Sequence, residues 1–265
     1  MGAIPRSVEL KLGRVDEHMR TLDENIQAFL QPEPYSAKRI VENEGRDHVL
    51  IWDKYLEPPD QIGLIAGDAI HNLRSSLDHL AVALAVEGAA AQGISITTKE
   101  VERIQFPIVL TESEFKNQLG RGRLRHVETA AKEFIEGFQP YRMTPAAPEW
   151  SNLYALSELD NADKHRLLTT AGLASTVLKV GWPSALNETQ LKDPEPPVRY
   201  EAGAEFGRFT FPSPQREEDV RVDFLWGFSL FIGTRWHTHD IRYIIGNYIS
   251  TVRQIIARAS QEFLP

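Results

Sequence analysis

The chain has 265 residues, of which 42% are hydrophobic and 25% charged, a composition typical of a globular protein with a sizeable core. The absence of cysteine excludes disulfides, thiolate metal sites and a cysteine nucleophile, and it suits a reducing compartment. With a formal net charge of −8, the surface as a whole does not attract nucleic acid, so an RNA site would need a local group of basic residues.

The sequence predicts no contact with a membrane. Even the apolar run from Leu80 to Val86 stops at Glu87, well short of the length that a membrane-spanning helix requires. The first ten residues also lack the apolar centre of a signal peptide. We therefore expect a cytoplasmic protein.

The first predicted element is a helix over about 1–31. Its apolar residues recur at alternating steps of four and three, the spacing of a helix packed lengthwise on another helix. They are Val8, Leu12, Val15, Met19, Leu22, Ile26 and Phe29. Pro32 and Pro34 end this helix. β-prone residues on both sides of 43–46 then predict a hairpin over about 35–56.

Further helices are predicted in the middle of the chain. Pro58 and Pro59 mark the start of a long central helix over about 60–87. The segment 111–114 has the pattern of a helix start, and Gly120 and Gly122 keep the helix that follows short. Two more helices are expected over about 124–138 and 150–167, on the spacing of their apolar residues.

Beyond residue 170 the spacing of apolar residues changes from helical to alternating. From Val220 to Ile232 every second residue is apolar, which predicts a strand, and Gly227 is a candidate for a bulge in it. Shorter strands are expected around 173–181, 197–202 and 206–211, and a last helix over about 238–263.

These elements predict a single α+β domain over 1–265. Its helical core is expected from about 1–31, 60–167 and 238–263, packed around the long central helix. An antiparallel sheet is expected mainly from the C-terminal half, over about 170–234, with the early hairpin over about 35–56.

The central helix carries an unusual number of ionisable side chains between Gly67 and Ala81. With about 100° between successive residues, they fall into two neighbouring files opposite the apolar face. One file holds Asp68, Asn72, Ser75 and His79, and the other holds His71, Arg74 and Asp78. We expect this polar surface to form one wall of a cleft, completed either by a segment over about 160–166 or by a second copy of the same helix.

Arg74 and His79 have the spacing R-x-x-x-x-H, which resembles the short pattern of the HEPN superfamily of helical ribonucleases. The resemblance implies a metal-independent endoribonuclease, a homodimer that brings two such helices together, and Arg74 and His79 as the catalytic pair. Many members have Asn, Asp or His directly after the Arg, where this chain has Ser75. Because the two residues lie about 140° apart around the helix axis, they do not meet through backbone placement alone.

The chemistry that the resemblance implies needs no cofactor. A histidine can take the proton of an RNA 2′-hydroxyl, and an arginine can stabilise the charge that gathers on the phosphate. Attack by the 2′ oxygen gives a 2′,3′-cyclic phosphate and confines cleavage to RNA. Asp78 or Asp68 is expected to orient the imidazole of His79, with His71, Asn72 and Ser75 as supporting residues.

A second polar group lies in the helix predicted over 150–167. It comprises Asp160, Asp163, Lys164, His165 and Arg166. Together with the motif of residues 67–80, the sequence Asp-Lys-His-Arg resembles uncharacterised bacterial proteins that carry both patterns, a resemblance that supplies no activity. The last three residues of the group are candidate phosphate contacts facing Arg74, and the alternative is a charged helix end.

A third candidate is a basic segment at 121–126, where Arg121, Arg123, Arg125 and His126 lie within six residues. We interpret it as a phosphate-binding patch, and the alternative is a solvated loop. An RNA substrate, a homodimer and an antitoxin partner in a defence setting complete this leading hypothesis.

Three alternatives stay open from the sequence. His71, Asp78 and His79 with His165 or Asp160 offer nitrogen and oxygen ligands for a metal-dependent hydrolase. A non-catalytic protein could bind a ligand or a partner with the same polar surface. The polar residues could also be structural, with each histidine bonded to a carboxylate or carbonyl and Arg74 in an ion pair.

Overall fold

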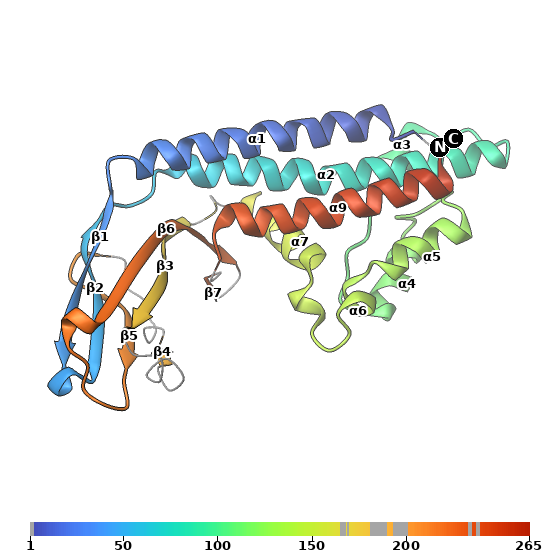
Figure 1. Ribbon diagram of the computed structural model, residues 1–265. Coiled ribbons are helices and arrows are strands. Elements are labelled where there is room, and N and C mark those ends of the chain that lie inside the picture. The colour runs from blue at the N-terminus through green and yellow to red at the C-terminus, as the bar shows by residue number, and fades with distance from the viewer. Residues whose placement is uncertain are drawn as a thin grey trace.

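The computed structural model describes residues 3–164, 168, 170–180, 190–192, 201–232, 235–236 and 239–265. Helices and antiparallel sheets occupy separate parts of the molecule, which makes the fold α+β, as predicted (Figure 1). The helices are α1 (Arg6–Leu30), α2 (Asp60–Ala91), α3 (Thr98–Val101), α4 (Glu112–Gly120), α5 (Thr129–Gly137), α6 (Pro140–Met143), α7 (Asn152–Asp163) and α9 (Ile241–Phe263), with short 3₁₀ turns η1 (Asn43–Gly45), η2 (Pro148–Trp150) and η3 (Glu217–Asp219).

Three long helices, α1, α2 and α9, lie alongside one another and form the length of the molecule (Figure 1). The apolar residues predicted on the first helix are the ones that it buries against this bundle, apart from Met19 and Phe29, which are partly buried. The chain ends meet at the far end, where the backbone amide of Ala3 donates to the carbonyl of Pro265 at 2.9 Å. Burial of these apolar faces, more than helix propensity, stabilises helices of this length.

The strands form two antiparallel sheets at the other end of the bundle (Figure 1). One has the order β1-β2-β5-β4 and the other β3-β6-β7. Their bounds are β1 (Tyr35–Glu42), β2 (Asp47–Tyr55), β3 (Thr170–Val180), β4 (Gln190–Lys192), β5 (Glu205–Thr210), β6 (Val220–Ile232) and β7 (Arg235–Trp236). The predicted early hairpin is therefore β1–β2, and it supplies half of the first sheet.

Aromatic side chains join the bundle to the sheets. Phe29 of α1 packs on Phe228 of β6 and on Tyr35 of β1, with ring centroids 5.7 and 5.9 Å apart. Trp52 of β2 continues this cluster to Trp226 of β6, at 5.4 Å. Such tilted and edge-on contacts add to the apolar area that the rings bury. The cluster holds helices and sheets in one packed unit.

Two predictions need correction, the start of one helix and a bulge in one strand. The helix expected from 124 begins only at Thr129, because residues 121–126 form turns in which His126 has a left-handed φ of 66°. No bulge lies at Gly227, since the pairing of β6 with β3 runs through it without a shift. A side chain at Gly227 would overlap the carboxylate of Asp240, which accepts from the amide of Phe228 and caps α9.

Other predictions fall partly outside the described residues. The strand expected at 197–202 is not described at 197–200, and residues 201–202 lie in a turn. Residues 165–167 of the helix predicted to 167, and 237–238 at the start of the last helix, are also not described. None of the described helices is both long enough and apolar enough to cross a membrane.

His48 of β2 is a fully buried imidazole that packs edge-on against the ring of Phe211, with centroids 5.1 Å apart. Burial lowers its pKa, and the charge of Arg39 lowers it further. Nearby backbone groups of Gly45 and Gln215 act in the opposite direction and raise the pKa. Neither ring nitrogen of His48 has a hydrogen-bond partner among the described residues. Since the unfolded chain accepts the proton at the ordinary pKa of 6.5 and the folded state resists it, stability is greatest above that pH and falls as the pH is lowered through it.

Replacing His48 by Leu should therefore flatten the pH dependence of stability. We expect the free energy of unfolding to fall between about pH 7.5 and about pH 5.5 in the wild type, and to fall less in His48→Leu. Part of the slope should persist, because burial also lowers the pKa of His79. Urea unfolding at the two pH values measures this, and an unchanged slope in the variant would contradict the assignment.

Candidate functional site

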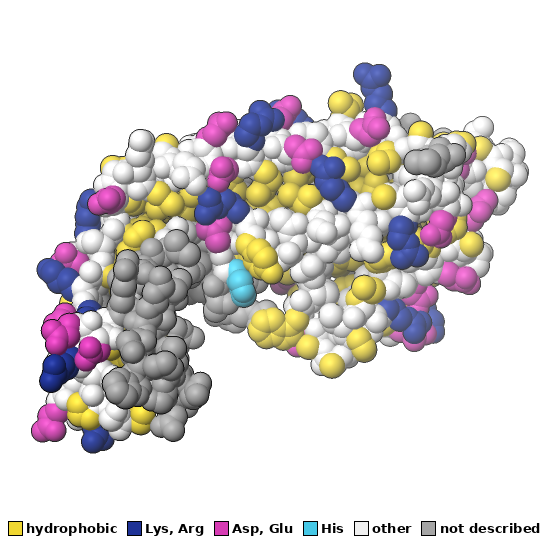
Figure 2. All heavy atoms as spheres, viewed as in Figure 1, with side chains coloured by type: hydrophobic (Ala, Val, Ile, Leu, Met, Phe, Trp, Pro, Cys, Tyr) yellow, Lys and Arg dark blue, Asp and Glu magenta, His cyan; other side chains and the backbone are white. Residues whose placement is uncertain are grey.

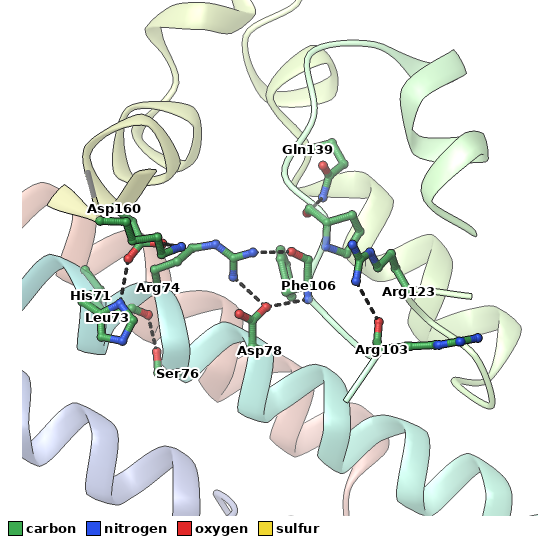
Figure 3. A network of polar contacts seen from close by, with 12 residues as sticks. His71, Leu73, Arg74, Ser76, Asp78, Arg103, Phe106, Arg123, Gln139 and Asp160 are labelled. Carbon is green, nitrogen blue, oxygen red and sulfur yellow. Dashed lines mark hydrogen bonds and ion pairs between the residues drawn. The ribbon is translucent and has the colours of Figure 1, made fainter. Parts of the chain in front are cut away.

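The polar residues in the middle of α2 do fall into two files, and each file has a different neighbour. Asn72 accepts a 3.4 Å hydrogen bond from Lys11 of α1, so the file of Asp68, Asn72, Ser75 and His79 borders α1. The file of His71, Arg74 and Asp78 faces α7 and the segment around Phe106 (Figure 3).

His71 and Asp160 form the contact between α2 and α7 that is best suited to acid–base chemistry (Figure 3). Nδ1 of His71 lies 2.9 Å from Oδ1 of Asp160, and Nζ of Lys164 donates to Oδ2 of the same carboxylate at 2.6 Å. The Asp160 side chain is 4% exposed, whereas that of His71 is 52% exposed. Since a carboxylate only accepts hydrogen bonds, it holds the proton on Nδ1 and leaves Nε2 as the basic nitrogen of a neutral ring.

The close approach of α7 to α2 depends on Gly67. A side chain at this position would overlap the carboxylate of Asp163. Gly67 is the first residue of the polar stretch, one turn before His71, so the same contact that admits Asp163 brings Asp160 within reach of the imidazole. The segment that begins at Asp160, one of the two elements expected to complete the polar wall, lies against it.

Carboxylates surround His71. Burial raises the pKa of Asp163, and the negative charges of Asp68 and Asp160 raise it further, while His71 lowers it. The side chains of Asp68, Asp160 and Asp163 therefore share one small region with the imidazole of His71 and the ammonium of Lys164.

Arg74 is bound to its own helix and to a distant loop (Figure 3). It donates from Nη1 to Oδ1 of Asp78 and from Nη2 to the carbonyl of Phe106, both at 2.8 Å. The same Asp78 oxygen accepts from the amide of Phe106 at 2.8 Å. With 14% of its side chain exposed, Arg74 closes a ring of hydrogen bonds that holds residue 106 against α2. Arg74 therefore forms an ion pair with Asp78, as the structural alternative predicted for this residue.

Asp78→Ala is expected to lower the free energy of unfolding by about 1–3 kcal/mol, because it leaves the Phe106 amide without its acceptor and Arg74 without its counter-ion. Asp78→Asn should cost less, since its amide oxygen can still accept from the Phe106 amide. Urea denaturation measures both.

The exposed Glu112–Lys116 pair provides the control, because Glu112→Ala also removes an i,i+4 ion pair. We expect little effect there, since exposed pairs contribute little. Equal losses in Asp78→Ala and Glu112→Ala would show that the ring around Arg74 is not structural.

His79 lies in the other file from Arg74. Burial lowers its pKa, the charge of Lys11 lowers it further, and the adjacent Asp78 raises it. The described residues show no hydrogen bond from His79 to Asp68 or Asp78, and Oδ1 of Asp78 is engaged by Arg74 and Phe106. The described residues show no hydrogen bond between Arg74 and His79, so their action as a catalytic pair stays a prediction.

No family model, curated protein or solved structure matches this chain.

The second polar group divides between two roles. Asp160 and Lys164 join the His71 contact, and Asp163 packs over Gly67. His165 and Arg166 lie outside the described residues. Lys164 is bound to Asp160 rather than placed against Arg74, yet its side chain remains 49% exposed and can reach a bound anion.

The basic segment is partly neutralised within the fold. Glu100 of α3 pairs with Nε of Arg125 at 3.3 Å and with Nε2 of His126 at 3.1 Å. Hydrogen bonds from the backbone amide of Thr97, the His126 ring and the Thr97 hydroxyl, together with the charge of Arg125, lower the pKa of Glu100 to about 2. Arg123 donates to the carbonyl of Arg103 at 3.2 Å, and its own carbonyl accepts from the amide of Gln105, next to Phe106.

Arg121 is exposed at the end of α4. The described residues contain no group of three or more His, Asp or Glu side chains placed to hold a metal ion. Two of the candidate metal ligands, His71 and Asp160, form a hydrogen bond with each other.

Two features of the site have no recognisable signal in the sequence. The first is the direct pairing of His71 with Asp160, which are 89 residues apart. The second is the role of residue 106, which acts through its backbone. Buried Gln139 supports that segment by accepting from the amide of Val109 at 3.1 Å and donating to the carbonyl of Pro107 at 2.8 Å.

Proposed function

We propose that the chain is a metal-independent endoribonuclease in which His71 is the general base and Asp160 is its positioning residue. The observation that supports this most is the half-exposed imidazole held through Nδ1 by a buried carboxylate, with Nε2 available to a substrate. The resemblance to HEPN ribonucleases, which rests on Arg74 and His79, implies the same reaction class but a different catalytic pair.

In the proposed reaction Nε2 of His71 takes the proton of an RNA 2′-hydroxyl. The 2′ oxygen then attacks the adjacent phosphorus, the bond from phosphorus to the 5′ oxygen breaks, and a 2′,3′-cyclic phosphate remains. The imidazolium returns its proton to the leaving 5′ oxygen. The exposed ammonium of Lys164, bound to the same Asp160, stabilises the charge that develops on the phosphate.

Basic side chains beyond Phe106 offer a route for the rest of the strand. Arg103 and Arg123 lie on the far side of residue 106 from Arg74 (Figure 3). Arg121 and Arg125 lie in the same turns as Arg123, with Arg125 in an ion pair with Glu100. Such a local series of cations is what a chain with a net charge of −8 requires to hold RNA. A cytoplasmic location and an antitoxin partner belong to the same proposal.

Incubation of the purified chain with mixed RNA tests the reaction class. We expect cleavage that persists in EDTA, leaves 2′,3′-cyclic phosphate ends and spares both DNA and RNA that carries 2′-deoxy nucleotides at the cut positions. Cleavage abolished by EDTA would indicate a metal-dependent hydrolase. The absence of any cleavage by the folded protein would refute the ribonuclease proposal.

One observation favours a second candidate, a protein that binds a ligand at this site without catalysis. Asp163 lies near His71, burial raises its pKa, and the negative charges of Asp68 and Asp160 raise it further, a setting that suits a ligand carrying an amine more than a polyanion. Spermidine is a suitable probe. This candidate predicts that spermidine raises the melting temperature of the wild type and has a smaller effect on Asp68→Asn, whereas equal shifts would count against it.

A further inference from the structure

The outward face of α1 carries a stripe of exposed residues that no part of the described chain covers. Two of them border a shallow hollow: Leu10 is 61% exposed, and Gly13 has nothing within 4 Å of where a Cβ would be. The hollow has a volume of about 530 Å³ and is lined by Arg6, Glu9, Leu10, Gly13, Arg14 and Glu17. Charged side chains of both signs stand along the edge of the molecule that α1 forms (Figure 2).

Packing within the described part of the monomer does not call for a glycine at position 13, because nothing lies within 4 Å of where its Cβ would be. Gly13 lies in the middle of a 25-residue helix, where glycine costs about 1 kcal/mol relative to alanine. The buried glycines Gly67 and Gly88 each have a neighbour that would meet a side chain, but Gly13 faces open space. A glycine beside an exposed leucine suits the close approach of another helix.

We propose that this face binds a second copy of the chain, with the two α1 helices antiparallel across a two-fold axis midway between Lys11 and Leu12. Leu10 of each copy then lies over the partner's Gly13, and Arg6 of each copy lies beside the partner's Glu17. All four residues fall within about 60° around the helix, so they share one seam. One pairing therefore satisfies both the apolar and the charged positions.

Charge selects the antiparallel arrangement and a second copy as the occupant. In a parallel pair in register, Arg6 would face Arg6 and Glu17 would face Glu17, which is repulsive. Glu17 already accepts from Arg14 of its own helix through Oε2 at 2.5 Å, which leaves Oε1 for the partner's Arg6. A seam of about three turns buries a small area, so we expect a weak and concentration-dependent dimer.

This interface is separate from the proposed function and does not rest on it. In Figure 1, α1 lies along one edge of the layer of long helices and α7 lies on the opposite side. The pairing leaves His71 and Asp160 accessible. It also differs from a dimer through the central helix, because α2 packs against the other face of α1.

Sedimentation velocity over a concentration series, with charge-reversed variants, tests the pairing. Arg6→Glu and Glu17→Arg should each weaken the dimer at least about tenfold, because each places like charges across both ends of the seam. An equimolar mixture of the two variants should form a heterodimer, since every pair is then complementary. A chain carrying both substitutions should dimerise like the wild type.

Gly13→Met provides a steric test in which the fold and the dimer should respond in opposite directions. Methionine favours the helix in the monomer, where the space is open, but its side chain would stand where the partner's Leu10 packs. We expect a higher melting temperature at low concentration together with loss of the dimer. Glu133→Arg, an exposed charge reversal on α5, is the control and should leave the dimer unchanged. A wild type that stays monomeric throughout, or variants that all dimerise like it, would refute the proposal.

Discussion

Asp160→Asn is expected to lower the rate of RNA cleavage about 100- to 10,000-fold while the protein remains folded. The side chain keeps its size, but its amide can present a donor to Nδ1 of His71, which then favours the tautomer with the proton on Nε2. That tautomer cannot accept the 2′-hydroxyl proton. Single-turnover cleavage, followed with circular dichroism as a check of folding, measures the effect.

Glu158→Gln is the matched control for this prediction. It makes the same change of carboxylate to amide on the same helix, at an exposed position two residues away. We expect its cleavage rate to remain within about twofold of the wild type, because surface substitutions away from the site have small effects. If Asp160→Asn also cleaved at the wild-type rate, the buried carboxylate would have no part in catalysis.

Gly88→Val is expected to destabilise the fold by about 3 kcal/mol or more, the largest effect on stability that we predict for a single substitution. A Cβ at this position of α2 would overlap the carbonyl oxygen of His126 and approach the amide of Glu128. Both are backbone atoms just before α5, so they cannot move away by a change of rotamer as a flexible side chain can. His126 also has a left-handed φ of 66°. Urea denaturation measures the loss.

A second helical glycine gives the control with the opposite sign. Gly13→Ala, on the open face of α1, should raise the free energy of unfolding by up to about 1 kcal/mol when measured at low concentration. A wild-type stability for Gly88→Val would mean that α2 and the 126–128 segment can separate without cost. A loss of stability in Gly13→Ala would mean that α1 is already covered within the monomer.

The elements with regular apolar spacing could be predicted from the sequence, because burial against one large neighbour leaves a periodic pattern. This holds for α1, α2 and β6. Pro32 and Pro34 also mark the C-terminal end of α1, and Pro58 and Pro59 mark the start of α2. The start of α5 could not be predicted. Leu124 and Val127 are apolar residues three positions apart, as on one face of a helix, yet the turn at His126 buries both without a helix.

The candidate site could be predicted in outline but not in its pairings. Helical geometry sorted the polar residues of α2 into the two files that the structure shows, because that depends on one helix alone. The partners of those residues come from elements that are 28 to 89 residues away, and side-chain type does not reveal which carboxylate meets which cation. The sequence therefore left open whether Arg74 is catalytic or structural, and the structure shows it engaged by Asp78 and by the backbone of Phe106.

The role of His71 as the general base is tested by comparing two histidines of the same helix in one assay. We predict that His71→Ala loses cleavage of RNA in EDTA by at least about 100-fold, while His79→Ala, in the other file, stays within a few-fold of the wild type. Both variants should unfold at urea concentrations close to that of the wild type. The reverse result, with His79→Ala inactive and His71→Ala active, would contradict the account and return the catalytic role to the pair of Arg74 and His79.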